Sequence, residues 1–257
     1  MTIKLFDKLF FDSSVGLGDA FVMNGIVRYF ASNCNKLYYP ARGEFFETLK
    51  CLYQDEPNIE VWRFYNNQQE DFFVENNNLQ RLRSPALVTS EIHRVGCRPE
   101  RIQIHWPQQI YENFDIPFSY RYKNFKLPKD IPGQEELYKK LTDGSTEYAL
   151  VARQASDHPN GIPLDVEGIR RLQGKDPIKI IEIVAGQTEN MLSYKLLIEQ
   201  ATEIHCIPSS FFNLVDGMVT EISARCYFHD IRANSLMKVN SRWNDHRWDI
   251  INYEIRY

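Results

Sequence analysis

The chain has 257 residues, of which 43% are hydrophobic and 25% charged, a composition that is ordinary for a globular protein and excludes wholesale disorder. Its net charge of −4 argues against a dedicated nucleic-acid-binding protein, which would carry a basic surface. The length allows one large domain or two small ones.

The sequence also predicts the compartment. No apolar run approaches the roughly 20 residues that span a bilayer, and Asp7 and Lys8 interrupt the short apolar run near the start, so we expect neither a transmembrane segment nor a signal peptide. The cysteines are scattered and form no CxxC pair, a pattern typical of reduced thiols in a cytoplasmic protein. They are Cys34, Cys51, Cys97, Cys206 and Cys226.

The first half of the chain is predicted to alternate strands with helices. The expected strands are residues 8–11, 36–40, 59–65 and 86–90. The expected helices are residues 19–31 and 44–54 and one that begins at Trp106, with Pro107 in its first turn. Between them, the Asn-rich segment 66–85 predicts a surface excursion or a short helix.

The second half alternates more clearly. The expected strands are residues 147–152, 177–183, 203–207 and 225–231. The expected helices between them are residues 165–174, 191–201 and 209–219. The first of these helices has Asp165 as a candidate N-cap and Gly174 as its stop signal. Strands that alternate with helices of this length predict parallel pairing with right-handed crossovers.

A segment rich in proline and glycine, near residues 130–145, separates the two halves and marks a domain boundary. We therefore predict an α/β protein with two Rossmann-like halves, mainly parallel sheets, and a ligand cleft between the halves. The first domain comprises residues 1–135 and the second residues 145–235. Residues 236–257 form a tail that packs back on the body.

The first candidate site is the turn that contains Gly16 and Gly18, followed by Asp19 at the expected helix start. Glycines between a strand and a helix let the backbone approach a ligand, and the helix N-terminus attracts anions. Phe21 stands where a dinucleotide fingerprint has its third glycine, which argues against an NAD site. From position alone, Asp19 is equally well explained as a helix N-cap.

The second candidate site combines Ser209 and Ser210, directly after an expected parallel strand, with Arg153 after another. Hydroxyls at a helix start and a guanidinium at the same carboxyl edge of the sheet suit a phosphate group. The alternatives are a serine N-cap that binds nothing and a surface salt bridge for Arg153.

Further residues near this edge are His229 and Arg232, at the end of the last expected strand. A lone histidine is more often structural than catalytic, and His205, inside an expected strand, is more strongly so. The sequence contains no HExxH, DxD, GxSxG, Walker or kinase motif, so we expect no metal site and none of the common hydrolase or phosphotransfer reactions.

Two segments together resemble a known family. GLGDAFVMNGIVRYF (residues 16–30) resembles the opening loop and first helix of the heptosyltransferase-like branch of GT-B-type glycosyltransferases. ENMLSYKLLIEQATEIHCIPSSFFNLVDGM (residues 189–218) resembles the donor half of that architecture. The resemblance covers about a third of the chain. It implies that Asp19 is the base toward the acceptor hydroxyl, and that Ser209, Ser210 and Arg153 contact the donor phosphates.

The resemblance thus implies a glycosyltransferase that moves a sugar from a nucleotide-sugar to an acceptor hydroxyl, with no metal and no cofactor beyond the donor. The first half would bind the acceptor, a glycan or another hydroxyl compound, and the second the donor. Glu182 and Asp216 are the acidic residues that we consider for a nucleotide ribose. The alternative is a non-catalytic protein of the same fold that binds a nucleotide or phospho-sugar.

Overall fold

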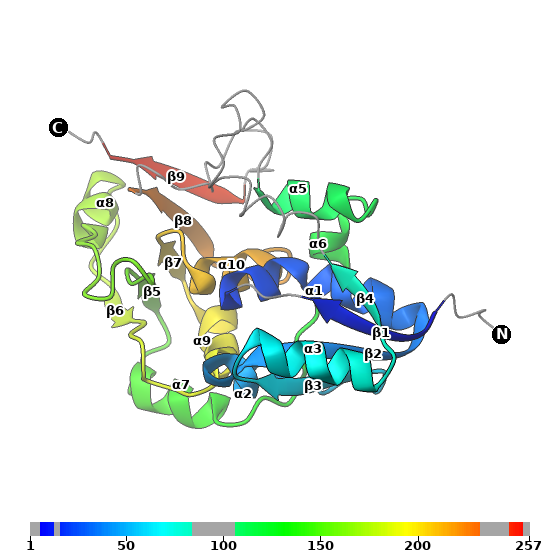
Figure 1. Ribbon diagram of the computed structural model, residues 1–257. Helices are drawn as coiled ribbons and strands as arrows, with labels where there is room; N and C mark the ends of the chain where they lie inside the picture. Colours follow the sequence, from blue (N-terminus) through cyan, green and yellow to red (C-terminus); the bar gives the residue numbers. More distant parts are fainter. Residues whose placement is uncertain (1–5, 13–15, 84–105, 232–246, 254–257) are drawn as a thin grey trace. The chain divides into compact units, whose positions relative to one another are not determined.

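The computed structural model describes residues 6–12, 16–83, 106–231 and 247–253. The chain divides into two compact units, residues 1–130 and 131–257. Each unit is built on one sheet in which all described strand pairs are parallel, with helices against the sheet (Figure 1). The predicted α/β class with two Rossmann-like halves is therefore confirmed.

The first unit has a four-stranded sheet in the order β3-β2-β1-β4. Its strands are β1 (Phe6–Asp12), β2 (Cys34–Arg42), β3 (Ile59–Phe64) and β4 (Gln80–Arg83). Its helices are α1 (Leu17–Ser32), the 3-10 turn η1 (Gly43–Phe45), α2 (Phe46–Leu52), α3 (Asn67–Asn76), α5 (Trp106–Asn113) and α6 (Tyr120–Lys123). From β1 to β3 the strands are added toward one edge of the sheet, and β4 is then added on the other side of β1. The crossovers therefore diverge between β1 and β4.

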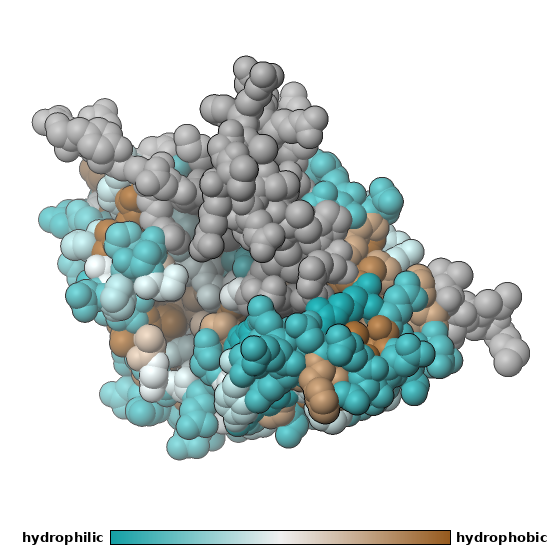
Figure 2. All heavy atoms as spheres, in the orientation of Figure 1, coloured by the Kyte–Doolittle hydropathy of each residue, from teal (hydrophilic) through white to brown (hydrophobic). Residues whose placement is uncertain are grey.

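The core of the first unit lies on both faces of this sheet, because neighbouring residues of a strand point to opposite sides. Phe11 of β1 packs against Phe30 of α1 and Phe114, which follows α5. Phe10 packs with Phe64 on the opposite face, in a cluster that includes residues of α3 and the turn after it. The outer surface over α3 is largely hydrophilic (Figure 2), which explains why its sequence looked like a surface excursion.

Gly25 lies where α1 approaches α6 most closely. A Cβ atom at this position would lie 2.4 Å from the backbone oxygen of Tyr120 and 2.9 Å from the hydroxyl of Tyr111. The backbone of Tyr120, unlike a flexible side chain, cannot rotate away from the added methyl group. We therefore expect Gly25→Ala to lower the free energy of unfolding by about 1–3 kcal/mol in denaturant titrations. Gly16→Ala is the control, because its Cβ would meet nothing closer than 3.9 Å. Equal stability of the two variants would contradict this account.

The second unit has a five-stranded sheet in the order β6-β5-β7-β8-β9. Its strands are β5 (Tyr148–Ala152), β6 (Lys179–Glu182), β7 (Glu203–Cys206), β8 (Arg225–Asp230) and β9 (Trp248–Asn252). Its helices are α7 (Gln134–Thr142), α8 (Val166–Leu172), the 3-10 turn η4 (Met191–Tyr194), α9 (Lys195–Gln200) and α10 (Ser210–Met218). Here the crossovers diverge between β5 and β7.

Local capping explains where the helices of the second unit begin and end. Asp165 accepts a hydrogen bond from the backbone N–H of Gly168 at 2.8 Å and caps α8, as predicted. Gly174, with φ of 67°, follows the end of this helix in the left-handed conformation that favours glycine. Val166 at the start of α8 packs on Ala149 and Val151 of β5. The helix therefore covers one face of the sheet.

Two strands were not predicted. β4 consists of the polar sequence Gln-Arg-Leu-Arg at the edge of the first sheet, within the segment that we had interpreted as a surface excursion or short helix. β9 lies in the stretch 236–257 that we had treated as a tail, and it pairs in parallel with β8. Residues 86–90, a predicted strand, lie outside the described residues.

Candidate functional site

In the first candidate site, the helix begins two residues earlier than predicted. Helix α1 starts at Leu17 with Gly16 as its N-cap, so Gly18 lies in the first turn and Asp19 is the third helical residue rather than the cap itself. The carboxylate of Asp19 reaches back and accepts the backbone N–H of Gly16 at 3.2 Å. This bond satisfies one of the donors that a helix start leaves free, and it holds the carboxylate at the helix entrance.

Burial gives the Asp19 carboxyl an unusual affinity for protons. Desolvation raises its pKa to about 6, although the hydrogen bond from Gly16 acts in the opposite direction. A carboxylate with this pKa is still mostly ionised at neutral pH, yet it accepts a proton more readily than an ordinary aspartate. Such a shift suits a general base.

A small hollow, open to solvent, lies in the first unit beside the start of α1. Its lining includes Gly16, Leu17, Arg42 and Glu70, but not Asp19. Arg42, at the carboxyl end of β2, forms an ion pair with the buried Glu70 at 3.2 Å. The two charges that line the hollow therefore offset one another. Sequence analysis missed both residues, although the place of Arg42 at a strand's carboxyl end was a usable signal.

In the second unit, Arg153 and Ser209 follow adjacent parallel strands, as predicted. Ala152, the last residue of β5, is paired with Cys206, the last residue of β7. The backbone N–H of Ile207 donates to Ala152 at 3.1 Å, which extends the pairing beyond the strands. Both candidates thus emerge at the carboxyl edge where the crossovers diverge, the usual ligand position in an open α/β sheet.

Each of these residues also has a structural contact. Ser209 is the N-cap of α10, and its hydroxyl oxygen accepts the backbone N–H of Phe212 at 3.2 Å. Ser210 is the first residue of the helix. Arg153 forms a half-exposed ion pair with Glu182 at 2.8 Å. Glu182, which we had considered for a ribose, therefore neutralises part of the Arg153 charge in the absence of a ligand.

Asp216, the other acidic residue considered for a ribose, lies in the core. It is 1% exposed, and one of its carboxylate oxygens accepts the indole N–H of Trp248 at 3.1 Å. It is therefore a structural residue. Burial likewise raises the pKa of the Cys206 thiol, and it raises that of Cys226 to about 12, which makes both poor nucleophiles. Arg232 lies outside the described residues.

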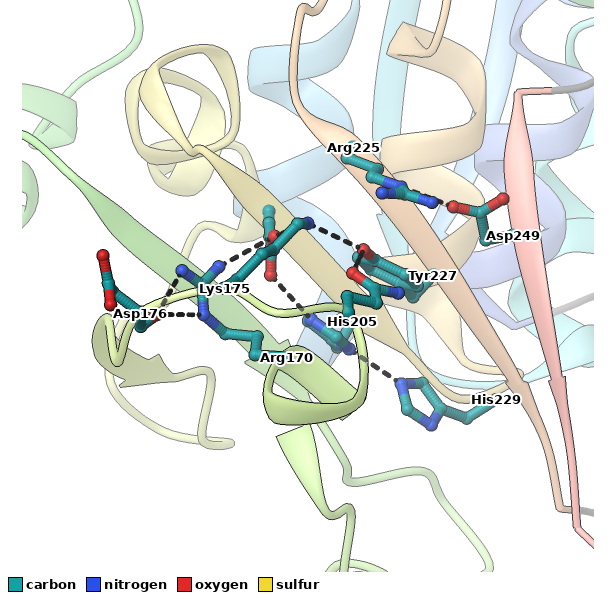
Figure 3. A network of polar contacts seen from close by, with 10 residues as sticks. Arg170, Lys175, Asp176, His205, Arg225, Tyr227, His229 and Asp249 are labelled. Carbon is teal, nitrogen blue, oxygen red and sulfur yellow. Dashed lines mark hydrogen bonds and ion pairs between the residues drawn. The ribbon is translucent and has the colours of Figure 1, made fainter. Parts of the chain in front are cut away.

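His229 belongs to a buried polar network on the α8 face of the second sheet (Figure 3). Its Nε2 atom lies 3.0 Å from Nδ1 of His205, and its Nδ1 atom lies 2.7 Å from the hydroxyl of Tyr253. His205 stacks on Tyr227, with ring centroids 4.4 Å apart and planes tilted by 11°. Its Nε2 atom lies 3.6 Å from Oε2 of Glu203.

Glu203 forms the other end of this network. Its Oε1 atom pairs with Arg170 at 2.8 Å and with the ammonium group of Lys175. Burial would raise the pKa of Glu203, but the hydrogen bonds from Lys175 and Arg170 outweigh that effect and lower it. The carboxylate is therefore ionised at neutral pH. Sequence analysis missed Glu203, Arg170 and Tyr253, because no motif links residues that only the sheet register brings together.

The two histidines predict that the protein loses stability in mild acid. Burial lowers the pKa of His205 to about 4, and burial together with His205 lowers that of His229 to about 3. Below the usual value of 6.5, the unfolded chain therefore binds two protons that the folded chain rejects. Asp19, whose pKa is raised, opposes this with one proton. We expect the free energy of unfolding to fall by on the order of 1 kcal/mol per pH unit between about pH 6 and pH 4.5.

Denaturant titrations across this pH range measure the effect. A free energy of unfolding that is constant or rises as the pH falls would show that the buried histidines carry charge in the folded state.

The described residues contain neither a metal-binding cluster nor a membrane-spanning helix. No cluster of three or more histidine, cysteine, aspartate or glutamate side chains with the geometry of a metal site occurs among them. Within the same part of the chain, no helix is both long enough and apolar enough to cross a membrane.

Comparison with known proteins identifies the fold. The sequence matches no protein-family model and no curated protein. The structure is similar to the crystal structure of a glycosyl transferase family 9 protein from Veillonella parvula DSM 2008, with a TM-score of 0.60 and 7% sequence identity. The match covers 98% of this chain and 88% of that one. The fold is therefore GT-B-like, as the sequence resemblance implied.

Proposed function

We propose that the protein is a glycosyltransferase that moves a sugar from a nucleotide-sugar, bound by the second unit, to an acceptor hydroxyl bound by the first. The observation that carries the proposal is the position of Arg153 and the start of α10 at the ends of the adjacent strands β5 and β7. The fold shared with a glycosyl transferase family 9 protein supports it. We propose further that the enzyme acts in the cytoplasm, which the scattered cysteines without a CxxC pair support.

The donor diphosphate would lie against the first turn of α10. The backbone N–H groups at the start of a helix have no acceptor within it, and they carry the positive end of the helix dipole. Ser210 adds a hydroxyl donor to this position. One terminal nitrogen of Arg153 contacts Glu182, and its other guanidinium nitrogens make no hydrogen bond to a described residue, so they are free to bind phosphate oxygens.

The reaction would proceed by displacement at the anomeric carbon of the donor. Asp19 accepts the proton of the acceptor hydroxyl, and the acceptor oxygen forms a bond to this carbon. The bond between the anomeric carbon and the diphosphate oxygen breaks, and the nucleoside diphosphate leaves with the electron pair. Arg153 and the start of α10 stabilise the charge that develops on the leaving group, a task that other enzymes give to a metal ion.

A second candidate is a protein of the same fold that binds a nucleotide or phospho-sugar without turnover. It is favoured by the fact that each proposed residue has a contact that explains it without catalysis: Asp19 with Gly16, Ser209 with Phe212, and Arg153 with Glu182. Under this hypothesis the carboxyl edge of the second sheet still binds a ligand, but Asp19 only stabilises the start of α1.

A thermal-shift panel of UDP, GDP, ADP and CMP and their sugars tests whether the second unit binds a nucleotide. A ligand that binds only the folded state raises the melting temperature by mass action, by an amount that grows with its concentration. We expect one nucleotide and its sugars to raise it and the others to have no effect. The absence of a shift with every compound would contradict the proposed enzyme and a non-catalytic nucleotide-binding protein alike.

A further inference from the structure

The chain of contacts from Glu203 to Tyr253 has a direction that the positions of its atoms determine. Three contacts join four side chains: Glu203 to His205 at 3.6 Å, His205 to His229 at 3.0 Å, and His229 to Tyr253 at 2.7 Å. In each contact one atom must supply the proton and the other a lone pair. A neutral histidine ring has one N–H donor and one nitrogen acceptor. The position of the proton in the first contact therefore determines the donor and the acceptor in each of the following contacts.

Glu203 fixes that end. Its Oε1 atom pairs with the two cations Arg170 and Lys175, whereas Oε2 lies 3.6 Å from Nε2 of His205, just beyond hydrogen-bond distance, and neither of these two atoms has a hydrogen-bond partner among the described residues. If Nε2 carried no proton, its lone pair would face a buried, negatively charged carboxylate oxygen and be repelled by it, whereas a proton on Nε2 is attracted to that charge. The proton of His205 therefore lies on Nε2, and its Nδ1 atom is an acceptor.

The remaining protons follow from this assignment. Since Nδ1 of His205 accepts, Nε2 of His229 must donate to it, which leaves Nδ1 of His229 as an acceptor. The hydroxyl of Tyr253 is then the donor to His229. The lowered pKa values of the two histidines keep both rings neutral at pH 7, as this order of protons requires. The stack of His205 on Tyr227 holds the first ring in place.

Tyr253 lies where a ligand of the second unit is expected. It follows the carboxyl end of β9, directly after Asn252, which is paired with Asp230 at the end of β8. Arg153 and Ser209 follow β5 and β7 at the same edge of the same sheet. The side chain of Tyr253 is partly buried, so part of it is accessible to a bound molecule.

We propose that Glu203 acts through His205 and His229 to commit the hydroxyl proton of Tyr253 to the protein, so that Tyr253 presents only an acceptor to the ligand and selects a sugar hydroxyl. A phosphate oxygen, which is itself an acceptor, is disfavoured at this position. The inference rests on the proposed function for the identity of the ligand, but not for the order of the protons. Glu203, His205 and His229 are positioning residues, and Tyr253 determines specificity.

Nitrogen-15 NMR of the histidine rings tests the order of protons without any ligand. At pH 7 we expect His205 and His229 of the wild type to be neutral, each with its proton on Nε2. A proton on Nδ1 of either ring, or a charged ring, would overturn the proposal. Tyr253→Phe is the matched control, because Glu203 still sets the direction and both protons should stay on Nε2.

Glu203→Gln tests the cause of this order. Arg170 and Lys175 should hold the amide oxygen of the glutamine, which turns its N–H group toward Nε2 of His205. The order of donors and acceptors should then reverse, with the protons of both histidines on Nδ1. Protons that remain on Nε2 in a folded variant would show that Glu203 does not set the direction. If this variant does not fold, the wild-type spectrum and the Tyr253→Phe spectrum still decide the order of protons.

Binding measurements test the ligand. Loss of one hydrogen bond should weaken the binding of nucleoside diphosphates and their sugars to Tyr253→Phe by about tenfold, whereas inorganic pyrophosphate should bind both proteins equally. Equal affinity of both proteins for every nucleotide and nucleotide-sugar that binds would overturn the role of Tyr253. If the wild type binds no nucleotide, the proposed function fails, while the NMR result still decides the order of protons.

Discussion

Replacing Asp19 by asparagine is expected to lower the rate of sugar transfer by about a hundredfold or more while the protein remains folded. Asparagine keeps the shape of the side chain, and its amide oxygen can still accept the backbone N–H of Gly16. It cannot accept a proton from the acceptor hydroxyl. The burial that raises the pKa of Asp19 also makes its charge costly at neutral pH, so the variant should melt at the same temperature as the wild type or higher.

The wild type offers an independent check on the same residue. A base with a pKa of about 6 is inactivated by protonation, so kcat/KM should fall as the pH decreases through about 6. The matched control is Asp115→Asn, the same change at an exposed aspartate of the same unit, whose left-handed backbone (φ of 54°) asparagine also adopts, and which should leave turnover unchanged. If Asp19→Asn transfers sugar at the wild-type rate, Asp19 serves only to stabilise the start of α1.

Replacing Ser210 by glutamate is expected to weaken nucleotide binding by on the order of a hundredfold. A carboxylate in the first turn of a helix stabilises that helix, because it lies at the positive end of the dipole. The same carboxylate would occupy the proposed position of the diphosphate and repel it, and like charges in contact cost several kcal/mol. Fold stability and ligand affinity should thus change in opposite directions.

Ser209 is left in place in this experiment because it caps α10, and its replacement would cost about 1 kcal/mol of stability for reasons unrelated to the ligand. Ser210→Gln, which has nearly the size of glutamate but no charge, is the control and should retain most of the affinity. Titration calorimetry with the nucleotide found in the thermal-shift panel measures both variants. Wild-type affinity in the glutamate variant would place the phosphates elsewhere.

The sequence predicted the second unit well because its signals are local. Each strand from β5 to β8 lies in a short segment that contains several apolar residues, and the helices between them carry recognisable caps at Asp165 and Ser209. Alternating elements of this kind have only a few possible arrangements, and parallel strands joined by helices are the usual one. The positions of Arg153 and Ser209 at one edge followed directly from that topology.

The failures came from residues whose structure depends on distant parts of the chain. β4 is polar because it lies at the edge of the first sheet, and β9 is a strand because β8 offers it a pairing edge. Neither short sequence predicts a strand by itself. The same holds for Glu203 and Tyr253. They are 50 residues apart in the sequence, and the pairing of the strands together with His205 and His229 connects them. The ion pair of Arg42 and Glu70 also joins separate elements, β2 and α3.

Release of nucleoside diphosphate from nucleotide-sugars tests the proposed function most directly. The wild-type protein is incubated with the sugars of the nucleotide that binds and with a panel of glycan and other hydroxyl acceptors, in the presence of EDTA. We expect acceptor-dependent release of the nucleoside diphosphate, formation of a glycosylated acceptor detectable by mass spectrometry, and loss of both in Asp19→Asn. Binding of a nucleotide without consumption of any donor sugar, by protein that is folded, would contradict the enzyme and favour the non-catalytic binding protein.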